Sequence, residues 1–70
     1  MLIYMKICFE DNDIIIETSV SIIEFFKLNK IDINNKRVYL NGNLLDKKTL
    51  HETILRDGDR IDTIRFMIGG

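Results

Sequence analysis

The sequence has one cysteine, Cys8, and one histidine, His51, among its 70 residues. A single cysteine cannot form a disulfide within the chain, which fits a reducing compartment. It also excludes a metal site built from several cysteines, and no cysteine lies near His51 in the sequence. An isolated cysteine is most often an inert, small apolar residue. We therefore expect no bound metal and assign no reactive role to either side chain.

Other features that would direct a protein to a membrane or to nucleic acid are also missing. The formal net charge is −1, so no general attraction draws the chain to nucleic acid or to an anionic membrane. No apolar run approaches the roughly 18 residues that cross a bilayer. The first residues, MLIYMKICF, lack the basic start and the small-residue cleavage site of a signal peptide. We expect a cytoplasmic protein that binds neither nucleic acid nor a membrane.

Proline, low-complexity segments and internal repeats are absent. The length of 70 residues suffices for one domain and not for two, so we expect one domain over residues 1–70.

Apolar residues alternate from Met5 to Phe9, which predicts a strand. The polar residues 10–13 predict a turn, because Asn and Asp are common in hairpins. Isoleucines occupy positions 14–16 and predict a second strand. These two strands should form an antiparallel hairpin.

A helix is predicted after the hairpin. Thr18 and Ser19 are candidate N-caps, because their hydroxyls can accept hydrogen bonds from the first helical N–H groups. The helix should end near Asn29 or Lys30. Its expected apolar stripe consists of Val20, Ile22, Ile23 and Phe26. That stripe should cover one face of a sheet.

Two turn signals divide the second half of the chain. Asn41-Gly42 lies between a predicted strand at 37–40 and a short strand at 44–45, and both turn residues tolerate positive φ. The acidic turn at 57–59 precedes a last predicted strand over 60–68.

The segment before that acidic turn is expected to be irregular or a single helical turn, with Leu50 and Ile54 pointing inward. The element order is then β-β-α-β-β-β. This order predicts an α+β fold in which one helix packs on a mixed sheet of four to five strands. The first and last strands should lie parallel at the centre.

This order resembles the ubiquitin-like β-grasp proteins, and most of all the sulfur carriers of the thiamine-biosynthesis type. These are related to the small subunit of molybdopterin synthase. The residues that carry the resemblance are Asn41-Gly42, the DGDRI motif at 57–61 and Gly69-Gly70, within VYLNGNLLDKKTLHETILRDGDRIDTIRFMIGG. Ile68 stands where the thiamine-type carriers often have a third small residue.

The resemblance implies a carrier rather than an enzyme. Its reacting group would be the terminal carboxylate of Gly70, adenylated by an ATP-dependent enzyme similar to ubiquitin-activating enzymes. A sulfur donor enzyme would then leave a thiocarboxylate that donates sulfur to a thiazole synthase. The expected flexible tail is 66–70, with Gly69 and Ile68 threading into the partner. ATP belongs to the partner, and no cofactor would be bound permanently.

A docking surface is expected on the face of the sheet that the helix leaves uncovered. Alternation places Tyr39, Ile64 and Phe66 on that face, with Arg37 and Arg65 at its rim. The expected helix-facing set is Val38, Leu40, Ile61 and Thr63. An exposed apolar group with a charged rim is typical of an interaction surface.

Three other functions remain open at this point. The sulfur could serve molybdopterin synthesis, with the large subunit of molybdopterin synthase as the partner. The chain could instead be a protein modifier that is joined through Gly70 to lysines of its targets. It could also be a β-grasp interaction module in which the glycine pair has no chemical role.

Overall fold

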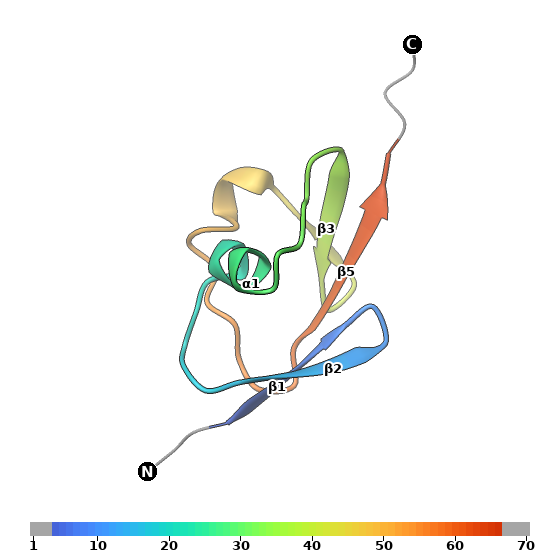
Figure 1. Ribbon diagram of the computed structural model, residues 1–70. Coiled ribbons are helices and arrows are strands. Elements are labelled where there is room, and N and C mark those ends of the chain that lie inside the picture. Colours follow the sequence, from blue (N-terminus) through green and yellow to red (C-terminus); the bar gives the residue numbers. More distant parts are fainter. Residues whose placement is uncertain (1–3, 67–70) are drawn as a thin grey trace.

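The computed structural model describes residues 4–66 (Figure 1). Its elements are β1 (Met5–Phe9), β2 (Asn12–Ile16), α1 (Ile22–Leu28), β3 (Lys36–Leu40), β4 (Asn43–Leu45), the short 3-10 helix η1 (Lys47–Thr49) and β5 (Arg60–Arg65). The strands form one five-stranded sheet in the order β2-β1-β5-β3-β4. The sheet curves around α1, which Figure 1 shows almost end-on. This arrangement confirms the predicted two-layer α+β fold.

The central strand is β5, and its pairing confirms the expected mixed sheet. It runs parallel to β1, with Cys8 opposite Arg60, and antiparallel to β3, with Val38 opposite Thr63. The outer pairs β1–β2 and β3–β4 are antiparallel hairpins. Because alternate residues of a strand point to opposite faces, this register gives the sheet two distinct faces. We call the face covered by α1 the inner face and the opposite face the outer face.

The core lies between α1 and the inner face. Phe25 and Phe26 of α1 pack edge-to-face on each other and on Phe9 of β1, with ring centroids 6.0–6.1 Å apart. The buried apolar residues are Ile7, Ile16, Val20, Ile22, Phe25, Phe26, Val38, Leu50, Leu55 and Ile61. The helical stripe therefore includes Phe25, which the sequence pattern missed, while Ile23 is only partly buried.

The helix starts later than expected, because Ser21 rather than Thr18 or Ser19 is its N-cap. The Ser21 hydroxyl accepts the N–H of Glu24, and the Glu24 carboxylate accepts the N–H of Ser21, both at 3.2 Å. This capping box satisfies two donors at once, an advantage that neither predicted residue has. Thr18 and Ser19 are exposed in the connection after β2.

The turns explain the strand lengths. Glu10 and Asp11 both have positive φ, so the first hairpin closes with a two-residue turn, and Asn12 and Asp13 belong to β2 rather than to the turn. Asn41 and Gly42 close the second hairpin in the predicted way, also with positive φ. Among the described residues the last strand ends at Arg65, and positions 67–68 of the predicted strand lie outside them.

The segment between β4 and β5 differs from the prediction at one position. Leu50 is buried as expected, but Ile54 is 51% exposed and Leu55 is buried in its place. The helical spacing from Leu50 to Ile54 fails because the chain becomes extended beyond Glu52. There Leu55 donates to the carbonyl of Val20 at 2.9 Å, and successive side chains point to opposite sides.

Candidate functional site

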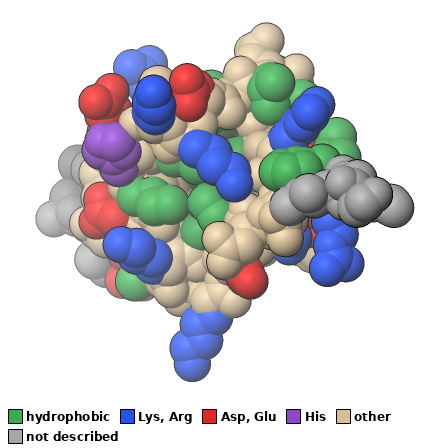
Figure 2. Space-filling model, turned by 90° about the horizontal axis from the view of Figure 1, so that it is seen from above, with side chains coloured by type: hydrophobic (Ala, Val, Ile, Leu, Met, Phe, Trp, Pro, Cys, Tyr) green, Lys and Arg blue, Asp and Glu red, His purple; other side chains and the backbone are tan. Residues whose placement is uncertain are grey.

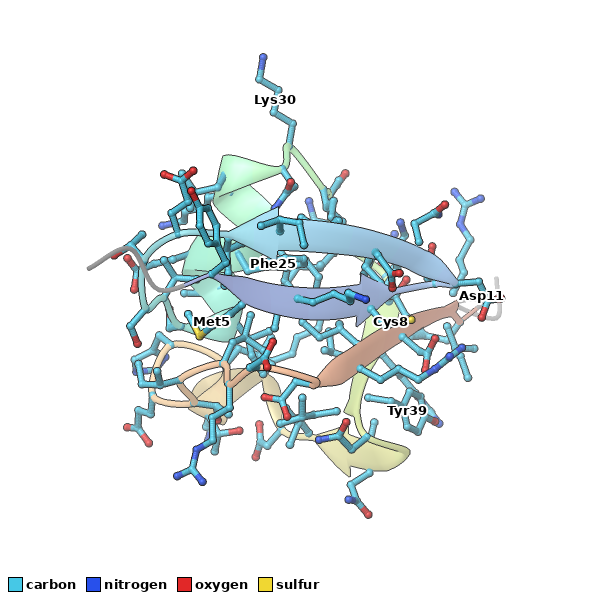
Figure 3. The ribbon with its side chains drawn as sticks, turned by 90° about the horizontal axis from the view of Figure 1, so that it is seen from below. Met5, Cys8, Asp11, Phe25, Lys30 and Tyr39 are labelled. Atoms are coloured by element: carbon cyan, nitrogen blue, oxygen red, sulfur yellow. The ribbon has the colours of Figure 1, made fainter. Side chains whose placement is uncertain are left out.

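Three apolar side chains lie next to each other on the outer face. Tyr39 of β3 stands opposite Leu44 of β4, and Ile64 of β5 is one diagonal step away from Tyr39. Leu44 and Ile64 are 56% and 53% exposed, while Tyr39 is half-buried. We call these three residues the outer-face cluster. Tyr39 is labelled in Figure 3, beside β3 and on the side of the sheet away from α1.

Sequence reasoning placed Tyr39 and Ile64 on this face, and the structure agrees. It missed Leu44. The signal was present, because a two-residue turn at Asn41-Gly42 pairs Leu40 with Asn43 and therefore Tyr39 with Leu44. The turn prediction thus contained the third member of the cluster.

A charged network lies beside the cluster on the same face. Arg60 contacts Asp62 and Asp11, each at 2.9 Å, so it ties the first hairpin to β5. These hydrogen bonds from Arg60, first the bond to the carboxylate of Asp62 and then the bond to that of Asp11, raise the pKa of Arg60 above its ordinary value. Arg60 is therefore fully charged in the physiological range. An Nη1 atom of the same guanidinium lies 3.7 Å from the Sγ of Cys8, which Figure 3 shows at the end of β1.

Phe66 lies just beyond β5, at the end of the sheet. Its N–H donates to the carbonyl of Asn35 at 3.0 Å, which extends the β3–β5 pairing by one residue. Its ring centroid is 5.7 Å from the Cζ of Arg37 and 5.8 Å from the Nζ of Lys47. Phe66 was predicted as an open docking residue at the start of a flexible tail. It is instead half-buried and held by neighbouring groups.

The two arginines expected at the rim differ in position. Arg37 stands opposite Ile64 and belongs to the outer face, as predicted. Arg65 stands opposite Lys36 and has the parity of Ile61 and Thr63, so it belongs to the inner side at the end of β5. Figure 2 looks down on this end of the molecule and shows hydrophobic and basic side chains gathered there.

The remaining predicted site residues, Ile68, Gly69 and Gly70, lie outside the described residues. Within residues 4–66, no group of three or more His, Cys, Asp or Glu side chains is arranged to hold a metal ion. None of the helices described is long and apolar enough to cross a membrane.

Comparison with solved structures finds the same fold in thiamine biosynthesis proteins. The crystal structure of the thiamine biosynthesis protein ThiS from Geobacter metallireducens superposes with a TM-score of 0.82 and 25% identity, over 94% of this chain and all of that one. An NMR structure of a thiamine biosynthesis protein from the same bacterium has a TM-score of 0.70 and 25% identity, over 94% and 88% of the two chains.

No family model and no curated protein matches the sequence. The strand order and both hairpin turns are those of a β-grasp sheet. The superposition covers the whole of a thiamine biosynthesis protein. The chain has the ubiquitin-like β-grasp fold predicted from the sequence, and its similarity to thiamine biosynthesis proteins extends over nearly the whole chain in three dimensions.

Proposed function

We propose that this protein is a sulfur carrier for thiazole formation in thiamine biosynthesis, and that the carboxylate of Gly70 carries the sulfur. The observation that carries the proposal is the match over 94% of the chain to a solved thiamine biosynthesis protein. The glycine pair supports it, because Gly69 and Gly70 follow the last described residue, Phe66, by only three and four residues. The chain itself carries the sulfur, and the catalytic groups belong to its partners.

The proposed chemistry gives Gly69 and Gly70 a role. A carboxylate is a poor electrophile until one of its oxygens is joined to AMP, with pyrophosphate as the leaving group from ATP. Sulfide (HS⁻) supplied by a donor enzyme then attacks the acyl carbon, the bond to AMP breaks, and a thiocarboxylate results. Gly69 and Gly70 have no Cβ atoms, so they fit a narrow channel and accept dihedral angles that other residues avoid.

Reach sets a geometric condition on delivery. Four residues beyond Phe66 span at most about 13 Å when fully extended. The acyl carbon must therefore react close to the surface on which the domain docks. Contacts outside the glycine pair must supply the affinity, because ordering a residue costs roughly 1–2 kcal/mol.

The outer-face cluster is the surface that best meets this condition. It combines exposed Leu44 and Ile64 with the half-buried ring of Tyr39, and Arg37 stands at its edge nearest Phe66. The proposed partners are an activating enzyme of the ubiquitin-activating type, a sulfur donor enzyme and a thiazole synthase. Each would need an apolar area that accepts this cluster.

Intact-mass measurement tests the proposal directly. The protein is incubated with its activating enzyme, ATP and a sulfur donor. We expect a mass gain equal to the replacement of one oxygen by one sulfur. Removal of Gly70 should leave the far-ultraviolet circular dichroism spectrum unchanged and abolish both adenylation and the mass gain.

The other functions predict different results in the same experiments. An unchanged mass with active partners would remove the sulfur-carrier proposal. Glycine-glycine remnants on target lysines after proteolysis would support a protein modifier. Copurification with the large subunit of molybdopterin synthase, rather than with a thiazole synthase, would show that the sulfur serves molybdopterin synthesis.

A further inference from the structure

The ring of Phe66 has two cationic neighbours from different parts of the chain. Arg37 comes from β3 and Lys47 from η1, and both charged groups lie within 6 Å of the ring centroid. The backbone N–H of Phe66 is bonded to the carbonyl of Asn35. We call Asn35, Arg37, Lys47 and Phe66 the Phe66 clamp. The ring is half-buried, whereas Ile64, two residues earlier inside β5, is 53% exposed.

The local backbone is built to present this carbonyl. Asn35 has a φ of 60°, in the left-handed region that Asn tolerates better than most residues. The turn is closed by the N–H of Lys36, which donates to the carbonyl of Ile33 at 3.1 Å. The Asn35 carbonyl is thereby directed across the end of the sheet toward Phe66.

The two cations have no competing carboxylate partner within residues 4–66. The ion pairs found there involve Lys6, His51 and Arg60, and neither Arg37 nor Lys47. A cation over an aromatic face is attracted by the negative charge density of the ring. Arg37 and Lys47 are thus free to hold Phe66, although the protein as a whole has more acidic than basic side chains.

We propose that Phe66 is a positioning residue, which fixes the point and direction from which the glycine-ended segment leaves the domain. This inference rests on the proposed function. If Phe66 were free, it would have to be ordered when the chain enters a partner, and the clamp removes this cost for Phe66. Pre-ordering lowers the entropic cost of binding without requiring any contact between Phe66 and the partner.

The first test uses the isolated protein and no partner. The double variant R37M/K47M keeps the apolar stems and removes both charges. In nuclear magnetic resonance spectra the side-chain protons of Arg37 and Lys47 should be shifted upfield by the ring. Protection of the Phe66 amide against hydrogen exchange should fall about fivefold in R37M/K47M, since two exposed cation–π contacts are lost.

The matched control is K48M/R65M, which removes two charges from the same end of the molecule without touching the ring. We expect it to leave the Phe66 amide unchanged. Equal protection in R37M/K47M and the wild type would overturn the clamp.

The second test measures adenylation kinetics with the activating enzyme. F66A should raise the KM several-fold with little change in kcat, because ordering is lost before the chemical step. F66W should restore the wild-type KM, since it keeps an aromatic face for both cations. F66A in the R37M/K47M background should add nothing further, because all three side chains act through one contact.

A different pattern would assign another role to Phe66. If F66A raises the KM and R37M/K47M does not, Phe66 is an anchor that contacts the partner and the positioning role fails. If the wild type is adenylated and every variant matches it, the positioning role alone fails. If the wild type is not adenylated by an active enzyme, the proposed function fails, and the positioning role fails with it.

Discussion

Ser21 is the one buried polar residue in the described part of the chain, and it is 1% exposed. Its burial is tolerated because its hydroxyl and its backbone N–H both have partners on Glu24. Its carbonyl accepts the N–H of Phe25, which places an aromatic ring in the core. One serine therefore connects the start of the helix to core packing.

We expect Ser21→Ala to lower the free energy of unfolding by about 1 kcal/mol, because the N–H of Glu24 loses its partner. Ser19→Ala is the matched control. Ser19 is exposed and caps nothing, so its replacement should change stability by less than about 0.5 kcal/mol. Urea denaturation followed by circular dichroism measures both values. A larger loss in Ser19→Ala than in Ser21→Ala would contradict this capping assignment.

At the scale of elements, the segment from η1 to β5 matters more for stability than its irregular backbone suggests. It closes over the start of α1: Ile22 donates to the carbonyl of Thr53, and Leu55 to that of Val20, each at 2.9 Å. Leu50 and Leu55 complete the core from this side. The segment thus takes the place of a regular element in the layer that contains α1.

Neighbouring residues of this segment should respond very differently to truncation. Leu55→Ala removes a side chain that is 1% exposed and should cost about 2–5 kcal/mol, enough to unfold much of so small a domain. Ile54→Ala removes a side chain that is 51% exposed and should cost less than about 0.5 kcal/mol. Chemical denaturation measures the stability loss of each variant. A larger loss for Ile54→Ala than for Leu55→Ala, as the helical spacing from Leu50 would predict, would contradict the structure.

At the scale of the whole molecule, the two faces of the sheet carry different kinds of residues. The inner face packs on α1, and the outer face presents the outer-face cluster beside the network around Arg60. Ile15 of β2 is also exposed on the outer face, but it lies beyond β1, on the far side of that network from the cluster. The core and the proposed docking surface therefore consist of different residues.

This separation predicts that docking variants retain the fold. Leu44→Ala and Ile64→Ala should each raise the KM for the activating enzyme about tenfold, equivalent to about 1.4 kcal/mol, with little change in stability. Ile15→Ala is the control, because its side chain is 55% exposed on the same face and lies outside the cluster. Equal effects of all three variants on the KM would show that the cluster is not the docking surface.

Much of the fold follows from local patterns in the sequence. Alternation predicted the strands and the faces of Tyr39 and Ile64, and Asn41-Gly42 predicted the second hairpin. These succeeded because side-chain direction in a strand and positive φ in a turn depend on near neighbours in the chain. The N-cap prediction was wrong because it overlooked a local signal, the Glu24 that stands three residues after Ser21. The Ile54 prediction was wrong because the contact of Leu55 with Val20, a distant residue, sets the direction of the side chains there.

The sequence by itself therefore determined the order of elements, the two-layer fold and the resemblance to sulfur carriers. Only the tertiary structure decided which residues complete the site. It placed the ring of Phe66 between Arg37 of β3 and Lys47 of η1. The physical reason is distance along the chain: a ring and two cations from three separate segments meet only after the sheet has formed.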